Sequence, residues 1–334
     1  TPFHNRWLKK HFKPGLSPQV RILKQFAKAQ GVYGSDTRVQ GFSGYLCELL
    51  VTHYSSFTKL VKEAASWEAG QVFIDPEGHH HHPDSIKPRF KDQPLIVIDP
   101  VDPNRNVAAA MSPANFSRFV DASKAFLAKP SARLFFAKPR KITLGDLERR
   151  MKRRKTRFLG VLFDQPQVIQ DVLWPQLRRG ARRLRDILEG YEFHVVGYDV
   201  WSDPEFTKGG KALMLLEMEV WDLPNIRKVV GPSIFIKKHS EEFLKKYRPK
   251  GRIMVEGKKW AAEIPRQWKT ADKKIKDSLS DPKKTLLEKG IPKYIAESVS
   301  KKFRLLEQKQ LLGLVKKQPE VGRFLLDYLE REVL

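Results

Sequence analysis

Apolar residues recur every three or four positions through the first third of the chain, which is the spacing of a helix with one buried face. The clearest run is Val20, Leu23, Phe26 and Ala27, and it ends at Gly31. Three more helices are expected, from Tyr45, over Phe57 to Trp67 and from Ser112. Two short strands are expected between them, at Gln71 to Asp75 and at Leu95 to Ile98. These elements predict a mostly helical domain over residues 1–136, with its boundary near Phe136.

After that boundary the pattern changes to alternating strands and helices. A strand, a helix and two strands are expected in turn at Phe158 to Phe163, Leu173 to Glu189, Glu192 to Trp201 and Lys211 to Trp221. This order is typical of an α+β layer, in which helices cover an antiparallel sheet, and we assign it to residues 137–265. Residues 266–334 are lysine-rich with a helical pattern that breaks at Gly290. We expect a basic helical tail there.

The charge of the chain favours a nucleic acid as partner. Lys and Arg total 63 of the 334 residues against 38 Asp and Glu, which gives a formal net charge of +25. Such an excess attracts phosphate backbones through a salt-dependent field. No apolar run is long enough to span a bilayer, so we expect a cytoplasmic protein that does not bind membranes.

The sequence contains no evident catalytic centre. It lacks the GxSxG, HExxH, P-loop and EF-hand patterns and any closely spaced D-x-D pair, whereas nucleotidyl transfer by two metal ions needs clustered carboxylates. The single cysteine, Cys47, lies in an apolar helix without the exposed, basic setting of a reactive thiolate. We therefore expect a binding scaffold, with no catalytic residues and no metal ligands of its own.

Two segments contain candidate ligand-binding residues. In GFSG, residues 41–44, the glycines suit either a phosphate cradle at a helix start or close packing of backbone. In DPVDPNRNVA, residues 99–108, Arg105 presents a planar fork of donors suited to a base edge or a phosphate, with a structural salt bridge as the alternative. Asp99 and Asp102 are candidates for metal ligands or bases, or for loop caps. The spacing of Lys24 alone favours a solvated face.

Two further clusters are visible in the sequence. Arg178, Arg182 and Arg185 share one face of an expected helix, which suits contact with RNA phosphates or a solvated surface equally. Four consecutive histidines, from His79 to His82, lie in a polar loop between a glycine and a proline. We interpret this run as a flexible loop tip and assign it no function.

Several motifs, taken in order, resemble the archaeal-type (class I) CCA-adding enzymes, the nucleotidyltransferases that restore the 3'-terminal CCA of tRNA. The motifs are TPFH, ILKQFAKAQGVYG, GFSGYLCELL and DPVDPNRNVA, followed by WPQL, GPSIF and GKKWAAEI. The resemblance covers most of the chain. It implies a helical neck, a body with a ferredoxin-like antiparallel sheet and a helical tail, preceded in the family by a catalytic head.

The resemblance also implies roles for individual residues. His4, Lys24 and Tyr33 match positions that contact the triphosphate and sugar of CTP or ATP. Arg105 matches an arginine that reads the nucleotide base together with phosphates of the tRNA backbone. The family has an arginine where this chain has Gln40, so one charge near the site is missing.

The tRNA itself is expected to bind through its acceptor and T-stem half. We expect Arg178, Arg182 and Arg185 and the lysines of the tail to contact phosphates there, because A-form RNA is recognised mainly by shape. A homodimer is a further candidate assembly.

The chain begins without a methionine and within an expected element, so we expect the family's catalytic head, in cis or in trans, as a partner. In the family, carboxylates of the head hold two Mg²⁺ ions that activate the tRNA 3'-hydroxyl for attack on the α-phosphate. The expected activity is addition or repair of CCA from CTP and ATP without a nucleic-acid template, with this chain supplying nucleotide selection and tRNA binding. The alternative is a non-enzymatic tRNA- or ribosome-associated RNA-binding protein derived from that family.

Overall fold

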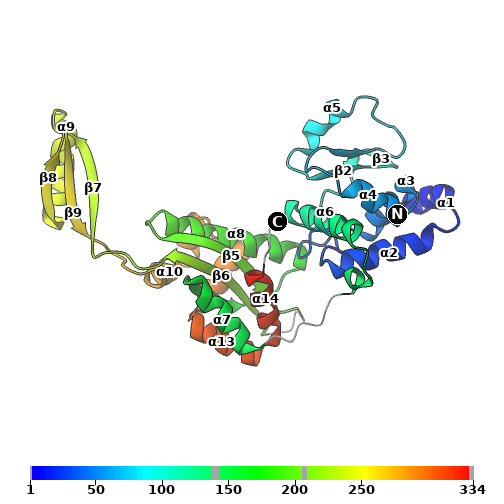
Figure 1. Cartoon of the computed structure of the whole chain (residues 1–334). Helices are drawn as coiled ribbons and strands as arrows, with labels where there is room; N and C mark the ends of the chain where they lie inside the picture. The colour runs from blue at the N-terminus through cyan, green and yellow to red at the C-terminus, as the bar shows by residue number, and fades with distance from the viewer. Residues whose placement is uncertain (1, 137–142, 205–208, 331–334) are drawn as a thin grey trace. The chain divides into compact units, whose positions relative to one another are not determined.

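The computed structural model describes residues 2–136, 143–204 and 209–330. These residues form two compact units, one within residues 2–136 and one within residues 143–330, and each is described by itself (Figure 1). The expected domain boundary after residue 136 adjoins residues 137–142, which lie outside the described residues. No helix in the described ranges is both long enough and apolar enough to cross a membrane.

The first unit is mostly helical, as expected. Its helices are α1 (Pro2–His11), α2 (Leu16–Ala29), α3 (Gly44–Tyr54), α4 (Phe57–Ala64), α5 (Pro83–Ile86) and α6 (Pro113–Ala128), with 3-10 turns at Lys87–Phe90 and Ala132–Phe135. The apolar stripe of α2 packs against α3, α4 and α6 around Phe26. The rings of Phe57 and Phe119 meet this ring edge-on, and buried aromatic side chains dominate the energetics of such a core.

Backbone hydrogen bonds join the segments 31–34 and 41–44. The amide of Phe42 donates to the carbonyl of Val32 at 2.7 Å, and the amide of Gly34 donates to the carbonyl of Phe42 at 2.8 Å. A Cβ atom on Gly41 would lie 1.9 Å from the carbonyl oxygen of Val32. Only glycine allows this approach, so the close-packing interpretation of GFSG is confirmed at Gly41.

A three-stranded sheet carries the loop around Arg105. Its strands are β1 (Val72–Ile74), β2 (Leu95–Asp99) and β3 (Asp102–Asn106), in that order, with β1 parallel and β3 antiparallel to β2. The buried side chain of Asn106 anchors β3, because its Oδ1 atom accepts from the amides of Val97 and Ala108 at 2.8 and 2.9 Å. Arg105 therefore lies on an edge strand beside an anchored neighbour.

The second unit contains a four-stranded antiparallel sheet in the order β10-β4-β6-β5. Its strands are β4 (Arg157–Asp164), β5 (His194–Ser202), β6 (Lys211–Val220) and β10 (Phe303–Glu307). Its helices are α7 (Leu144–Arg154), α8 (Gln170–Glu189), α10 (Ala271–Leu279), α11 (Lys283–Glu288), α12 (Lys293–Lys301), α13 (Gln308–Lys317) and α14 (Pro319–Leu329). The succession β4, α8, β5, β6, helices and β10 is ferredoxin-like, so the α+β expectation is confirmed.

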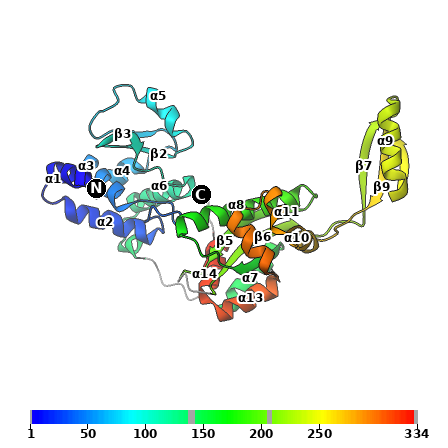
Figure 2. The ribbon, with the colours of Figure 1, turned by 180° about the vertical axis from the view of Figure 1, so that it is seen from behind.

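Helices cover both faces of this sheet. Helices α8, α10, α11 and α12 pack on one face and α7, α13 and α14 on the other, as the two opposite views show (Figure 1 and Figure 2). The central positions of β4 and β6 are therefore buried and almost all apolar, with charged residues at the strand ends. Among the buried positions of these two strands, the one charged residue is Glu217. Its carboxylate accepts hydrogen bonds from Arg154, Thr156 and Tyr328.

The structure differs from the expectation for residues 266–334. Helices α10 to α12 share a core with α8, and β10 pairs with β4 from Phe303 to Glu307. The boundary expected at residue 265 therefore falls inside the ferredoxin-like fold, and the segment after it is not a purely helical tail. A strand of 5 residues between two helices is too short for its apolar pattern to be told from a helix.

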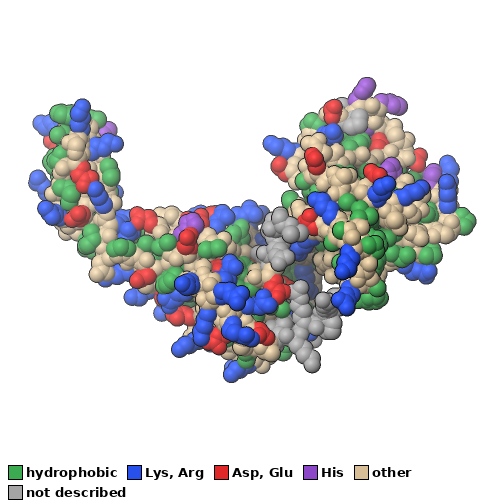
Figure 3. Space-filling view, viewed as in Figure 1, with side chains coloured by type: hydrophobic (Ala, Val, Ile, Leu, Met, Phe, Trp, Pro, Cys, Tyr) green, Lys and Arg blue, Asp and Glu red, His purple; other side chains and the backbone are tan. Residues whose placement is uncertain are grey.

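A smaller layer is inserted between β6 and α10, and we call it the β7–β9 module. It contains β7 (Ile226–Ser233), α9 (Lys237–Tyr247), a 3-10 turn (Arg248–Lys250), β8 (Arg252–Glu256) and β9 (Lys259–Pro265). Its antiparallel strands follow the order β7-β9-β8. A Cβ atom on Gly231 would lie 2.6 Å from the ring of Phe243, so α9 packs closely on this sheet. Lys and Arg side chains spread over the module (Figure 3).

Candidate functional site

The buried carboxylate of Asp99 joins two of the expected site residues. Its Oδ2 atom accepts from Nε2 of His4 at 2.9 Å and from Nη1 of Arg105 at 3.3 Å. Its Oδ1 atom accepts from the amide of Val101 at 3.1 Å. Asp99 is therefore a loop cap, as one interpretation of the sequence expected, and it is also the anion that holds His4 and Arg105 together.

Arg105 retains most of its hydrogen-bonding capacity. Its side chain is 56% exposed, whereas that of Asp99 is 0% exposed. A guanidinium has five N–H donors in one plane, and Asp99 accepts from a single nitrogen. The salt bridge that was the alternative interpretation of Arg105 is confirmed. It does not exclude ligand binding, because more than half of the side chain is exposed.

A cavity of about 540 Å³ lies beside Arg105. Its lining includes Ser43, Gln93 and Asn104, so hydroxyl, amide and guanidinium groups converge on one space. Cavities of several hundred Å³ with a few converging polar groups are typical of small-molecule sites.

Tyr45 lines the same cavity and lies next to His4. The two rings have their centres 4.7 Å apart. Burial and the negative charge of Asp99 raise the pKa of Tyr45. Its hydroxyl therefore stays protonated at neutral pH and is available as a hydrogen-bond donor.

The other two expected residues, Lys24 and Tyr33, meet at the start of α3. A Cβ atom on Gly44 would lie 3.5 Å from both Nζ of Lys24 and Oη of Tyr33, so both polar atoms lie against the first residue of the helix. The N-terminus of a helix also attracts anions through its unpaired amides and dipole. A Cβ atom at position 44 would be in ordinary van der Waals contact with both side chains, so they already lie close to this end of the helix.

Lys24 is paired in this structure. Its Nζ atom lies 2.9 Å from Oε1 of Glu48, and its side chain is 26% exposed. Burial alone would lower the pKa of Lys24, but the Glu48 carboxylate outweighs it and raises the pKa. The interpretation of Lys24 as part of a freely solvated face therefore does not hold. Lys24 also lines a second cavity of about 550 Å³, together with Lys9, Arg21 and Glu48.

Sequence reasoning did not assign Tyr45 or Glu48 to the site, and it gave Asp99 other roles. A signal for Glu48 was present, because it follows Gly44 by one helical turn and so shares its face. For Asp99 the signal was its place at the end of a strand whose residues are all buried. A carboxylate there needs a cationic or hydrogen-bonding partner.

The three arginines of α8 lie on one face of the helix, as their spacing predicts. Nε of Arg182 donates to Oη of Tyr198 at 3.4 Å, and the guanidinium of Arg185 lies 5.3 Å from the centre of the same ring. Arg185 is also paired with Asp186 at 2.6 Å, whereas Arg178 lies over the ring of Trp174. Arg182 is exposed, so it is the best placed of the three for an external phosphate.

The described residues contain no group of three or more His, Cys, Asp or Glu side chains arranged to hold a metal ion. Burial raises the pKa of Cys47 to about 12, which keeps this thiol protonated and unreactive. The residues around Asp99 and Gly44 can bind and orient a ligand through hydrogen bonds and charge.

Two family models match the chain. The one described as tRNA nucleotidyltransferase, second domain, matches residues 18–136, and the one described as CCA-adding enzyme, C-terminal domain, matches residues 154–308. The second match begins just before β4 and ends just after β10. It therefore spans the whole ferredoxin-like sheet together with the β7–β9 module.

Curated relatives are similar over most of the chain. The CCA-adding enzyme of Methanosarcina acetivorans is 36% identical over 97% of this chain and 67% of its own length. That of Methanopyrus kandleri is 36% identical over 100% of this chain and 69% of its own length. That of Halobacterium salinarum is 39% identical, over 74% of this chain and 52% of its own length. The chain thus spans about two thirds of the length of the first two relatives.

Proposed function

This chain belongs to the CCA-adding enzymes, a family of tRNA nucleotidyltransferases, and we propose that it selects CTP and ATP and binds tRNA during addition of the 3'-terminal CCA. The proposed reaction needs no nucleic-acid template and takes place in the cytoplasm. The observation that carries the proposal is the arrangement of His4 and Arg105 around the buried Asp99, beside a cavity of about 540 Å³.

Arg105 supplies the donors that read the base. Cytosine and adenine each present a ring-nitrogen acceptor with an exocyclic amine beside it, whereas uracil and guanine carry a proton on the corresponding ring nitrogen. A guanidinium can donate to the ring nitrogen of cytosine or adenine. In uracil and guanine the corresponding N–H is itself a donor, so no hydrogen bond forms there. A tRNA phosphate is suited to accept from the exocyclic amine. This complementarity supports selection of C and A without a template.

Lys24, Tyr33 and the start of α3 form the proposed triphosphate site. The amine and the phenol both lie against Gly44. His4 lies beside the ring of Tyr45, with the ring centres 4.7 Å apart, and is bonded to Asp99. A phosphate group at Lys24 competes with Glu48 for the amine. Glu48 thus keeps the amine charged and oriented before the nucleotide binds.

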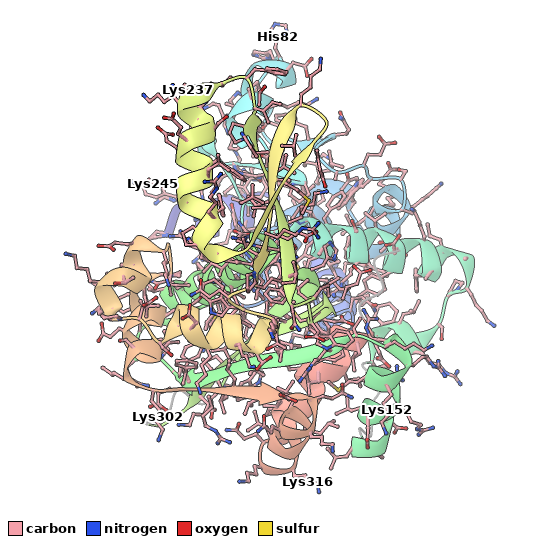
Figure 4. All side chains as sticks on the ribbon, turned by 90° about the vertical axis from the view of Figure 1, so that its left-hand side faces the viewer. His82, Lys152, Lys237, Lys245, Lys302 and Lys316 are labelled. Carbon is pink, nitrogen blue, oxygen red and sulfur yellow. The ribbon has the colours of Figure 1, made fainter. Side chains whose placement is uncertain are left out.

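The tRNA is proposed to bind the second unit through charge and shape. Arg182 offers an exposed cation on α8, with Arg178 and Arg185 beside it. On the β7–β9 module, Lys237 and Lys245 project from α9 (Figure 4), and an exposed aromatic residue, Phe235 at 75%, stands two residues before this helix begins. Lysines and an exposed aromatic ring on one module suit RNA phosphates and an unpaired base.

The chemical step is assigned to a catalytic head, in cis or in trans. The described residues do not fit a Mg²⁺ site, because they contain no carboxylate cluster that could hold the ion. We therefore derive no step of the transfer from them. Metal ligands in a head would supply the activation of the 3'-hydroxyl, while the residues of this chain hold the nucleotide and the tRNA.

The test uses the 334-residue chain, a tRNA that lacks its CCA end and the catalytic head of a relative added in trans. Incorporation of CMP and AMP that is lost in Arg105→Ala and kept in Arg133→Ala, an exposed arginine of the same unit, supports the proposal. Salt-dependent tRNA binding without any binding of CTP or ATP would instead favour the alternative, a non-enzymatic RNA-binding protein.

A further inference from the structure

Two of the four consecutive histidines contact the hairpin that carries Arg105. Nε2 of His79 lies 3.0 Å from the carbonyl oxygen of Pro100, and Nε2 of His80 lies 2.8 Å from that of Pro103. A carbonyl oxygen only accepts, so each imidazole donates its Nε2 proton. The interpretation of this run as a flexible loop tip is therefore wrong for its first two members.

The loop that carries these histidines is itself held in place. The amide of His80 donates to Oδ2 of Asp75 at 2.8 Å. Oε1 of Glu77 accepts from Nε1 of Trp7 at 2.6 Å and lies 3.5 Å from Nε2 of His11. Both of these partners lie on α1. Residues 75–80 thus connect α1 to the β2–β3 hairpin, and we call this segment the histidine loop.

The histidine loop is a second connection between α1 and the β2–β3 hairpin, in addition to the one that Asp99 makes. Asp99 ends β2 and bonds to His4 of α1, whereas the histidine loop reaches the same helix and the same hairpin through other residues. Among the described strands, β3 lies at the edge of its sheet and has β2 as its one neighbour. Without a second support, an edge hairpin can twist about its base, and its exposed side chains then change direction.

We propose that His79 and His80 are positioning residues for base selection, because they hold the hairpin in the orientation in which Arg105 reads the nucleotide base. This inference rests on the function proposed above. Discrimination between bases by hydrogen-bond donors requires that the donors be fixed, since a mobile guanidinium can turn to meet the acceptors of a wrong base. Bonds to backbone carbonyls suit this purpose, because they fix the path of the hairpin itself.

The test compares three variants of the 334-residue chain. The double variant His79→Ala/His80→Ala removes both donors, and His79→Gln/His80→Gln restores an N–H at a similar distance from the backbone. His81→Ala is the matched control, since His81 belongs to the same run and is exposed. His82 projects outward (Figure 4). Two quantities are measured: amide hydrogen exchange of the peptide that covers residues 99–106, and the ratio of the affinities for CTP and UTP.

We expect the double alanine variant to exchange residues 99–106 about tenfold faster than the wild type, because the hairpin opens locally more often. We expect its CTP affinity to fall about fivefold, equivalent to roughly 1 kcal/mol, and the ratio of CTP to UTP affinity to fall with it. The glutamine variant should recover most of both effects, and His81→Ala should show neither.

Unchanged exchange at residues 99–106 would overturn the inference. Faster exchange with an unchanged ratio of CTP to UTP affinity would also overturn it, because the histidines would then be merely structural. A wild-type chain that binds neither nucleotide would refute the proposed function itself, and with it the role in base selection. If Arg105→Ala weakens CTP binding while the double alanine variant does not, the proposed function stands and the histidine inference falls.

Discussion

Nε2 of His4 lies 2.9 Å from Oδ2 of Asp99, although 95 residues separate the two in the chain. The contact brings α1 to the end of β2, and the same carboxylate oxygen accepts from Arg105. One buried carboxylate therefore organises two residues that we propose for nucleotide contact. A change at this carboxylate is expected to affect both of them together.

Replacing Asp99 by Asn keeps the side-chain volume and removes that charge. We expect the free energy of unfolding to fall by about 1–3 kcal/mol, the usual cost of disrupting a buried hydrogen-bonded group, and CTP affinity to fall about tenfold. Urea denaturation and CTP titration measure the two effects. Asp102→Asn is the control, because Asp102 is exposed and bonds only the nearby amide of Asn104 among the contacts resolved here. Equal effects at both positions would contradict the central role of Asp99.

The pair of Lys24 and Glu48 predicts opposite effects for its two members. Lys24→Ala should weaken triphosphate binding about tenfold, on the scale of one charge-assisted contact. Glu48→Gln should strengthen it severalfold, since a phosphate then meets an amine without a competing carboxylate. Binding of ATP at low and moderate salt measures both, with the exposed Lys59→Ala as control. Weaker binding in Glu48→Gln would show that Glu48 orients the amine more than it competes for it.

Gly41→Ala should destabilise the first unit. The added Cβ atom would lie 1.9 Å from the carbonyl oxygen of Val32, so the two backbone segments must separate. We expect a loss of at least about 2 kcal/mol in the free energy of unfolding, as for other overpacked sites. In Gly313→Ala the new atom meets nothing within 4 Å inside helix α13, and stability should rise by about 0.5–1 kcal/mol. Thermal unfolding monitored by circular dichroism distinguishes the two, and similar effects at both sites would argue against the close approach.

Glu217 predicts a pH dependence of stability. Burial alone would raise the pKa of Glu217, but hydrogen bonds from Arg154, Thr156 and Tyr328 lower it. A carboxyl group whose pKa is lower in the folded state stabilises the protein above the unfolded pKa, about 4.3 for Glu. That contribution is lost as the pH falls through the folded pKa.

We therefore expect Glu217→Gln to be less stable than the wild type by about 1–3 kcal/mol at neutral pH. The difference should shrink as the pH falls below about 4. Urea unfolding between neutral pH and about pH 3 measures it. A difference that does not change with pH would mean that the charge of Glu217 contributes nothing.

The arginine face of α8 predicts graded effects on tRNA binding. Arg182→Ala should reduce the affinity for tRNA. It should also reduce the steepness of log affinity against log salt by about 1, the value for one lost phosphate contact. Arg185→Ala should have a smaller effect, because Asp186 already pairs with this guanidinium. Filter binding over a range of salt concentrations measures both slopes. Equal slopes for the wild type and Arg182→Ala would contradict phosphate contact at this position.

The fold was predictable where a long apolar period or a family motif was present. The period through Phe26 predicted α2, and the segments Phe158 to Phe163 and Lys211 to Trp221 were expected as strands, which the structure confirms as β4 and β6. Strand β10 was missed because the pairing that makes it a strand is with β4, far away in the sequence. Local pattern contains no information about such a partner.

The same limit applies to the candidate site. Residue types identified Arg105 as a fork of donors, but they did not indicate its bond to Asp99 or the contact of His80 with the hairpin that carries it. Single residues at ligand positions can be recognised from a family motif. The side chains that support them lie on other elements, and only the folded chain brings them together.

The pairing of β10 with β4 has a consequence for synthesis of the chain. Strand β4 begins at Arg157, but its partner ends at Glu307, so the ribosome must add well over a hundred residues before the sheet can close. At about 5–20 residues per second this interval is on the order of ten seconds. Throughout it, one edge of β4 presents unpaired backbone groups, which invite pairing with other chains. Newly made copies that stall before β10 are therefore expected to depend on chaperones, whereas the β7–β9 module, already complete, does not wait for the last strand.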